Sequence, residues 1–411
     1  MAFVDKIIGI VVFCIMLVSL LADPAPVSIE LSDVILILLP FFLGFLSLVT
    51  LKSYKIYLPE KNLLIAIMIY LGYLLLSMLL GLMHGVPFLN SLRSLGPYIN
   101  FFPLILLGLL PIRLVNPWMI GTTLMLVGAM QASYQLYLYV HHSYGSAGTL
   151  DVLRHRITLL EPRTTLPIIL SVTTLPMVWL SNKNSLAKYL ALSFILFGLV
   201  AAAATLTRSI IISIVVGWVT YSILFLTTQS YKQLFRKFFI YFIVLMAVIL
   251  LMSLIPKINM LEQGVWARFS YHSSAAGSTD YSNGRLYDEW LPAINTWANS
   301  GVLGLFFGIG AGNTFIVASG EERTYIHNLA IYSLVYGGFY GLFACLWLYF
   351  TVFKTLLIRA AQSNQLIYLG FAALLASMFS YAQLFAVHKG LAFNAMLFLI
   401  ITLALSQPRR T

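Results

Sequence analysis

Residues 327–341 read His-Asn-Leu-Ala-Ile-Tyr-Ser-Leu-Val-Tyr-Gly-Gly-Phe-Tyr-Gly, and the chain stays almost entirely apolar as far as Phe353. A helix needs about 20 mostly apolar residues to cross a bilayer, and this stretch is long enough. Stretches of similar character begin near Ile7, Leu31, Leu63, Tyr98, Trp118, Leu166, Ala187, Ser209, Phe239, His327, Gln365 and Gly390. This repetition predicts an all-α polytopic membrane protein with about twelve transmembrane helices.

The overall composition supports this interpretation. The chain has 411 residues, of which 60% are hydrophobic and 9% charged, and its mean hydropathy is +0.93. A soluble globule cannot keep so many apolar side chains away from water, so the chain must use lipid as its solvent. The first apolar stretch is followed by Asp23 and Pro24 rather than by the small-residue cleavage site of a signal peptide, so we expect it to remain in the protein as a helix.

Cys14 and Cys345 both lie in apolar runs, and we expect them to serve in packing.

The charged residues predict the orientation in the membrane. The net charge is +11, and an even number of spans puts both termini on one side. If that side is the cytoplasm, its only acidic residues are Asp5 and Glu60, and its basic residues are Lys6, Lys52, Lys55, Lys61, Arg113, Lys183, Lys188, Lys232, Arg236, Lys237, Lys354, Arg359, Arg409 and Arg410. This excess follows the positive-inside rule. Because the bases lie in separate short loops, we do not expect a nucleic-acid partner.

The basic residues of the opposite face are of a different kind. Apart from Lys257 and Lys389 they are all arginines: Arg93, Arg154, Arg156, Arg163, Arg208, Arg268, Arg285 and Arg323. Either residue would serve orientation equally well, but the planar guanidinium binds phosphate oxygens in pairs. The outer face is therefore expected to handle phosphate, and the candidate substrate-binding arginines are Arg93, Arg154, Arg156, Arg163 and Arg268.

The chain divides into three segments. We expect nine spans in residues 1–255, a large outer loop at 256–326 and three spans in 327–411, with helices packed mainly against their sequence neighbours. The loop contains a helix-start signal at Ser282-Asn283-Gly284. Apolar residues then recur at helical spacing: Leu286, Trp290, Ile294 and Trp297. This pattern predicts a short amphipathic helix in the membrane interface, with Pro292 kinking it or confining it to one turn on each side.

Two arginines and one histidine are the candidate catalytic residues. Arg208 lies at a tight turn of small residues between two apolar stretches, a costly place for a cation unless it snorkels or binds an anion. Arg285 opens the amphipathic helix, whose N-terminus favours an anion, although a surface salt bridge to Asp288 or Glu289 is the alternative. His327 stands at a helix start, where the helix dipole and nearby arginines favour a neutral imidazole that can act as a base.

The glycines that follow His327 predict rigid packing. Gly337, Gly338 and Gly341 would let this helix approach a neighbour closely and so hold the histidine in place. The sequence contains neither an Asp-x-Asp pair nor a Gly-x-x-x-x-Gly-Lys loop, and the His141-His142 pair lacks a third ligand. We therefore expect no metal and no cofactor, and a donor that reaches the outer face already activated.

The chain resembles the superfamily of O-antigen ligases and polymerases, bacterial glycosyltransferases that use glycans on a polyprenyl diphosphate. The resemblance rests on Ser282-Asn-Gly-Arg285 to Trp290, on the Gly308-Ile-Gly-Ala-Gly312 turn, and on His327-Asn328 followed after nine residues by Gly338-Phe-Tyr-Gly341. It implies an architecture like that of the GT-C glycosyltransferases, located in a Gram-negative inner membrane. The donor would be a glycan on undecaprenyl diphosphate, and the acceptor a hydroxyl of the lipid A core at the periplasmic face.

The resemblance also implies roles for single residues. Arg208 and Arg285 would bind the diphosphate leaving group, His327 would deprotonate or orient the acceptor hydroxyl, and Asn328 is a further candidate for substrate binding. A ligase is favoured, and an O-antigen or capsule polymerase with the same donor is the nearest alternative. A flippase for lipid-linked sugars is a third possibility, but such proteins place ionisable groups at mid-membrane, whereas the carboxylates of this chain fall in loops or near span ends.

Overall fold

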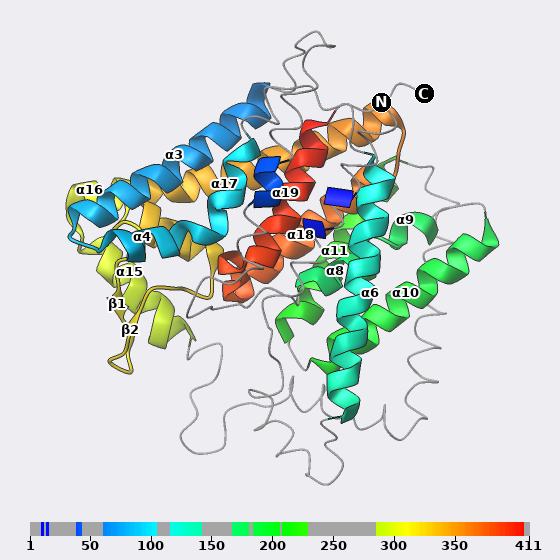
Figure 1. The fold of residues 1–411 in the computed structure, drawn as a ribbon, viewed down its shortest axis with the longest axis horizontal. Coiled ribbons are helices and arrows are strands. Elements are labelled where there is room, and N and C mark those ends of the chain that lie inside the picture. Colours follow the sequence, from blue (N-terminus) through cyan, green and yellow to red (C-terminus); the bar gives the residue numbers. More distant parts are fainter. Residues whose placement is uncertain are drawn as a thin grey trace.

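The computed structural model is mostly helical (Figure 1). It describes residues 61–104, 116–141, 167–180, 184–205, 208–228 and 285–406, with short pieces at 10–11, 14–15 and 38–42. The spans expected near Ile7, Leu31 and Phe239 lie outside these ranges, apart from the short pieces. The structure therefore tests the helices of the middle and the C-terminal part of the chain.

The elements follow one another in two groups. The first comprises α3 (Lys61–Met83), α4 (Phe88–Leu95), the 3-10 helix η2 (Gly96–Phe101), α6 (Pro117–His141), α8 (Ile169–Thr174), α9 (Met177–Leu180), α10 (Ser185–Ala204) and α11 (Arg208–Thr228). The second comprises the π-helix η4 (Arg285–Trp290), α15 (Leu291–Ala298), α16 (Gly301–Phe307), β1 (Phe315–Ile316), β2 (Glu322–Arg323), α17 (Leu329–Ser363), α18 (Ile367–Leu384), the 3-10 helix η5 (Ala386–Lys389) and α19 (Leu391–Leu405).

Five of the described helices are long and apolar enough to cross a membrane. They are Lys61–Met83, Ser185–Ala204, Ser209–Thr227, Leu329–Ser363 and Ile367–Leu384, and two shorter apolar helices cover Ile169–Leu180 and Ala392–Leu405. Each lies in a stretch where the sequence predicts a span, which confirms an all-α membrane protein, while the number twelve stays a prediction. The stretch near Leu166 is divided into α8 and α9 around Pro176, because proline has no N–H to continue the helical hydrogen bonds.

The principal packing partners are far apart in the sequence. α17 packs along α3, and α11 packs along α18. Buried hydroxyls join both pairs: Ser77 donates to the carbonyl of Tyr336 at 2.9 Å, and Ser377 donates to that of Ser213 at 2.6 Å. The expectation that helices pack mainly against their sequence neighbours is wrong for these pairs. A short connection does not decide which helix a given helix packs against, because apolar helix surfaces are suited equally to lipid and to protein.

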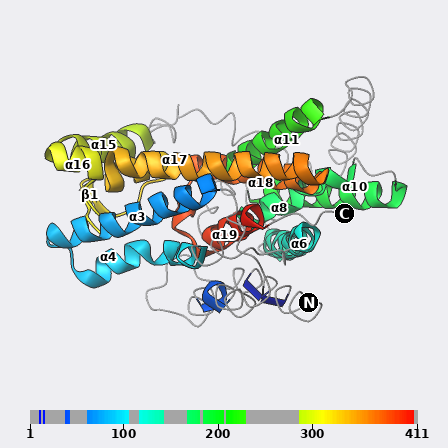
Figure 2. The same ribbon diagram turned by 90° about the horizontal axis from the view of Figure 1, so that it is seen from above.

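The described part of the predicted outer loop is folded. η4, α15, α16 and the two strands gather at one end of the α3–α17 pair (Figure 2). The turn from Gly308 to Gly312 fits between α3 and α17: a Cβ on Gly308 would meet the backbone of Gly337 at 2.3 Å, and one on Gly338 would meet the backbone of Phe306 at 2.3 Å. Only glycine permits so close a contact between backbones, which confirms the predicted close packing of the glycine-rich helix.

The same contact compensates for a break in α17. Gly338 adopts φ 63° and ψ −160°, which interrupts the helical hydrogen bonds of the preceding turn. The carbonyl of Val335 accepts from the N–H of Ile309 at 2.9 Å, and that of Tyr336 accepts from Ser77. Backbone groups without water must find partners within the protein, so the break and the inserted turn stabilise each other. The described part of the predicted outer loop, residues 285–326, is thereby fixed to α3 and α17, and it is called the outer segment below.

Replacing Gly338 with alanine should destabilise this joint. The added Cβ would clash with the backbone of Phe306 and would occupy a positive φ, and together these effects should lower the free energy of unfolding by about 2–5 kcal/mol. Denaturant titration in detergent micelles measures the change. Gly96→Ala is the control, because Gly96 has helical dihedrals and no atom lies within 4 Å of its added Cβ. Equal stability of the two variants would contradict the proposed role of Gly338.

Candidate active site

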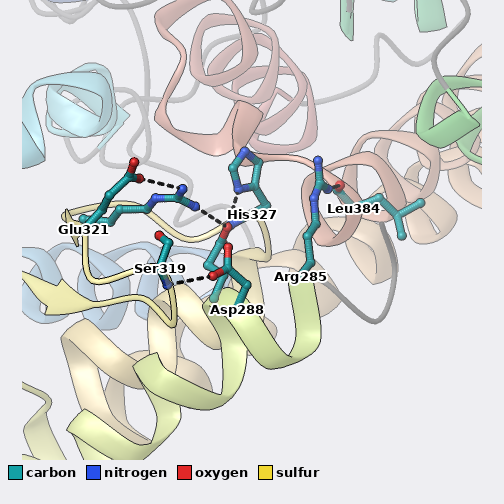
Figure 3. A network of polar contacts seen from close by, with 8 residues as sticks. Arg285, Asp288, Ser319, Glu321, His327 and Leu384 are labelled. Carbon is teal, nitrogen blue, oxygen red and sulfur yellow. Dashed lines mark hydrogen bonds and ion pairs between the residues drawn. The ribbon is translucent and has the colours of Figure 1, made fainter. Parts of the chain in front are cut away.

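A buried carboxylate lies at the centre of the polar contacts on the outer segment. The side chain of Glu289, on η4, is only 2% exposed. It accepts hydrogen bonds from the backbone N–H of His327 and from the imidazole Nδ1 of His327, the latter at 2.7 Å. Arg323 of β2 places a guanidinium nitrogen 3.6 Å from the same carboxylate (Figure 3). Three segments of the chain therefore meet at one side chain.

Glu289 is held in its ionised form. Burial by itself would raise the pKa of Glu289, but the hydrogen bonds and the charge of His327, with a contribution from the charge of Arg285, outweigh burial and lower the pKa below its ordinary value. An ionised carboxylate can only accept hydrogen bonds, so Nδ1 of His327 carries the proton between them. This fixes the orientation of the ring and makes Nδ1 a nitrogen that carries a proton.

Local packing explains how Glu289 reaches this position. Glu289, Ala293 and Trp297 form the buried face of η4 and α15, and the Trp297 ring packs edge-on against Phe339 of α17, with 5.3 Å between centroids. Pro292 does not confine the helix as expected, because it lies in the first turn of α15, where no intrahelical N–H is needed. Helix α15 continues to Ala298.

The small β-hairpin brings Arg323 to the carboxylate. β1 and β2 are antiparallel, with Phe315 opposite Arg323. Asp288 fixes the hairpin to η4, since its carbonyl accepts from Ala318 N at 3.0 Å and its carboxylate accepts from Ser319 N at 3.2 Å. Arg323 also pairs with Glu321 at 3.0 Å. The positive charge beside Glu289 is thus set by the turn that follows β1.

His327 presents its second ring nitrogen away from the carboxylate. The side chain is 19% exposed and lies between the rings of Tyr325 and Phe385, whose centroids are 5.3 and 5.5 Å away. Its Nε2 makes no hydrogen bond to any residue that the structure describes. The imidazole is therefore held through Nδ1, with Nε2 as the atom that can accept a proton.

Arg285 lies beside Phe385, attached to the end of α18. Its guanidinium donates to the carbonyl of Leu384, and its central carbon lies 5.8 Å from the centroid of the Phe385 ring. The alternative of a salt bridge is not found within the described residues, since Asp288 and Glu289 have the other partners given above. Arg285 begins a π-helix of six residues that leads directly into α15, and the expected anion site at this helix start stays a prediction.

The remaining predicted residues differ in what the structure says of them. Arg208 begins α11, and α10 ends at Ala204 with Thr205 as its C-cap, but residues 206–207 and the side chain of Arg208 lie outside the described part, so the tight turn stays a prediction. Arg93 is exposed on α4 and makes no hydrogen bond or ion pair to a described residue. Asn328 caps α17 by accepting from Ile331 N at 2.9 Å and donates to the Gln383 carbonyl at 3.1 Å. The predicted binding residues outside the described ranges are Arg154, Arg156, Arg163 and Arg268.

The structure therefore brings together His327 and Arg285 and adds two residues that the sequence did not place in the site, Glu289 and Arg323. The sequence contains a signal for Glu289, because it shares the four-residue spacing of Ala293 and Trp297 on the apolar face. No described group of three or more His, Cys, Asp or Glu side chains could hold a metal ion. Comparison with protein-family models and with curated proteins found no match.

Replacing Glu289 with glutamine should show how much the ionised carboxylate contributes to the stability of the fold. The pKa of Glu289 is lower in the folded state than its unfolded-state value of about 4.3, so the ionised carboxylate stabilises the fold at any pH above that value. This stabilisation is lost as the pH falls through the folded-state pKa. At pH 7 the variant should lose about 1–3 kcal/mol of unfolding free energy, and the difference from wild type should narrow below about pH 4.

The matched control is Glu322→Gln, an exposed residue of the same hairpin. It should change the unfolding free energy little at any pH. If the unfolding free energies of Glu289→Gln and wild type differed by the same amount at pH 7 and at pH 3, the loss of stability would come from packing and not from the ion pair.

Proposed function

We propose that this chain is a membrane glycosyltransferase that moves a glycan from undecaprenyl diphosphate to a hydroxyl of the lipid A core, as an O-antigen ligase does. The reaction would take place at the outer face of a Gram-negative inner membrane, with both termini in the cytoplasm. The observation that supports it most is the pairing of His327 with buried Glu289, which leaves Nε2 without a described partner while Arg285 lies nearby. A base next to a cation suits the transfer of a group away from phosphate.

The imidazole would act as the general base. Nε2 of His327 takes the proton of the acceptor hydroxyl while its oxygen forms a bond to the anomeric carbon of the glycan. The imidazolium that results is stabilised by the Glu289 carboxylate, which already accepts from Nδ1. Because Glu289 is ionised before the reaction begins, this stabilisation needs no rearrangement.

The cations would act on the leaving group. The bond between the anomeric carbon and the phosphate oxygen breaks, and its electron pair leaves with undecaprenyl diphosphate, so negative charge grows on the diphosphate. Arginines directed at this charge stabilise the transition state more than the bound substrate. Arg285 donates to the neutral carbonyl of Leu384 in the described structure. A phosphate oxygen is a stronger acceptor than this carbonyl, so a bound diphosphate can compete for the guanidinium.

Removal of the base should abolish transfer. Purified full-length protein is incubated with lipid-linked glycan and rough lipopolysaccharide, and the glycosylated product is measured. His327→Ala should lower the rate by about 10²–10⁴-fold. His84→Ala is the control, because the ring of this exposed histidine contacts the backbone carbonyl of Ile309 and none of the described site residues. Transfer at the wild-type rate by His327→Ala would disprove the role of this residue, and polymer growth on the lipid carrier alone would indicate a polymerase.

The geometry of the guanidinium is tested by Arg285→Lys. Lysine keeps the charge but loses the planar pair of donors, so the variant should insert and fold yet transfer glycan at least about tenfold more slowly. The same exchange at Arg208 should act in the same direction. Lys354→Arg is the control, because it makes the reverse exchange at an exposed position of α17 and should leave the transfer rate unchanged. Normal turnover by Arg285→Lys would leave Arg285 as a structural anchor for the end of α18.

A further inference from the structure

We propose that Lys389, in the η5 turn between α18 and α19, is a further phosphate-binding residue of this site. The proposal rests on the proposed function and adds a cation to it. In the sequence, Lys389 is one of two lysines on a predicted face whose other bases are arginines, and the proposed mechanism gives it no role.

Lys389 is attached to the segment that carries His327 and Arg323. Its ammonium group donates to the carbonyl of Thr324 at 2.7 Å, and Thr324 directly follows Arg323. At the other end of the same turn, Phe385 packs against His327, and Arg285 is bound to Leu384. The short segment 384–389 therefore connects Arg285 at one end with Lys389 at the other, and His327 contacts it in between.

No carboxylate among the described residues forms an ion pair with the ammonium group of Lys389. The ion pairs among the described residues involve only Glu289 and Glu321 as acids, and neither pairs with Lys389. Its other close contacts are the faces of Tyr332 and Tyr336, with ring centroids 5.1 and 6.0 Å away. Aromatic faces attract a cation, but they do not neutralise it.

The neighbouring histidine does not add a second positive charge. His388 is 1% exposed, and burial together with the charges of Lys389 and His327 lowers its pKa well below the ordinary value, so the ring is neutral. Burial also lowers the pKa of Lys389, to about 7. This is the direction expected for an ammonium group that has lost water and gained no carboxylate. An anion that arrives beside it would favour the charged form.

The chemistry of the group favours phosphate as that anion. An ammonium has three donors, and the Thr324 carbonyl uses one, which leaves two for oxygens of a ligand. Lysine binds phosphate as a point charge, whereas arginine binds it with a planar pair of donors. Two cations attached to the two ends of one short segment suit a ligand with two linked phosphates. Lys389 and Arg285 would then share the diphosphate beside His327.

The test is a binding measurement on the full chain in detergent. Farnesyl diphosphate serves as a short polyprenyl diphosphate, and farnesol serves as the uncharged probe. Lys389→Gln should weaken farnesyl diphosphate binding by about tenfold or more, whereas Lys389→Arg should stay within about threefold of wild type. Lys354→Gln removes the same charge from an exposed position of α17 and should bind both probes as wild type does.

A second measurement uses the wild-type protein and does not depend on how a variant folds. Bound farnesyl diphosphate should slow the acetylation of Lys389 at least about threefold, as followed by mass spectrometry, while farnesol should not, and Lys354 should react equally in all samples. Equal acetylation of Lys389 with and without farnesyl diphosphate would overturn the proposal. An equal loss of diphosphate and farnesol binding in Lys389→Gln would also overturn it.

The two proposals fail in different ways. If wild type binds farnesyl diphosphate, and Lys389→Gln binds it equally well, only the role of Lys389 is wrong. If wild type binds farnesol but not the diphosphate, both the role of Lys389 and the donor class of the proposed function are wrong. Full glycan transfer by His327→Ala would count against the proposed mechanism and leave the measured affinity of Lys389 for phosphate unchanged.

Discussion

The buried carboxylate of Glu289 is the constraint on which the outer segment depends. A carboxylate that is 2% exposed must lose its charge or find cationic and hydrogen-bonding partners. Glu289 finds them in the His327 backbone, the His327 imidazole and Arg323, which belong to segments that the chain connects only distantly. The hairpin and the start of α17 are thereby drawn to η4. The same interaction that satisfies the buried charge also orients the imidazole.

The glycine contact between the outer segment and the membrane helices makes that geometry possible. Gly308 and Gly338 allow the turn after α16 to touch the backbone of α17, and the break at Gly338 exposes carbonyls that Ile309 and Ser77 satisfy. Each irregularity is acceptable only because the other is present, since unpaired backbone groups are costly away from water. His327 lies at the start of the helix held in this way, so its position relative to Glu289 is fixed from both sides.

The end of α18 and the η5 turn bring two basic side chains, Arg285 and Lys389, to the site. Arg285 is bound to Leu384, Asn328 to Gln383, and Lys389 to Thr324, so the segment 383–389 contacts residues that flank His327 in the sequence as well as Arg285. Glu289 is committed to His327 and Arg323, and none of the described ion pairs joins a carboxylate to Lys389. The segment thereby connects Arg285, His327 and Lys389.

The sequence by itself determined the class of the protein, the positions of the described spans and the close packing at Gly337–Gly341, because apolar length and residue spacing are local properties. It also proposed His327 and Arg285 as candidate site residues. Only the tertiary structure decided that α17 packs with α3 and α11 with α18, since apolar surfaces in lipid look alike along the sequence. It also decided the partners of His327. Glu289 could be placed on the apolar face of its helix from spacing alone, but which residue would neutralise it depends on a contact between residues 38 positions apart. Such long-range contacts are set by packing and not by local sequence.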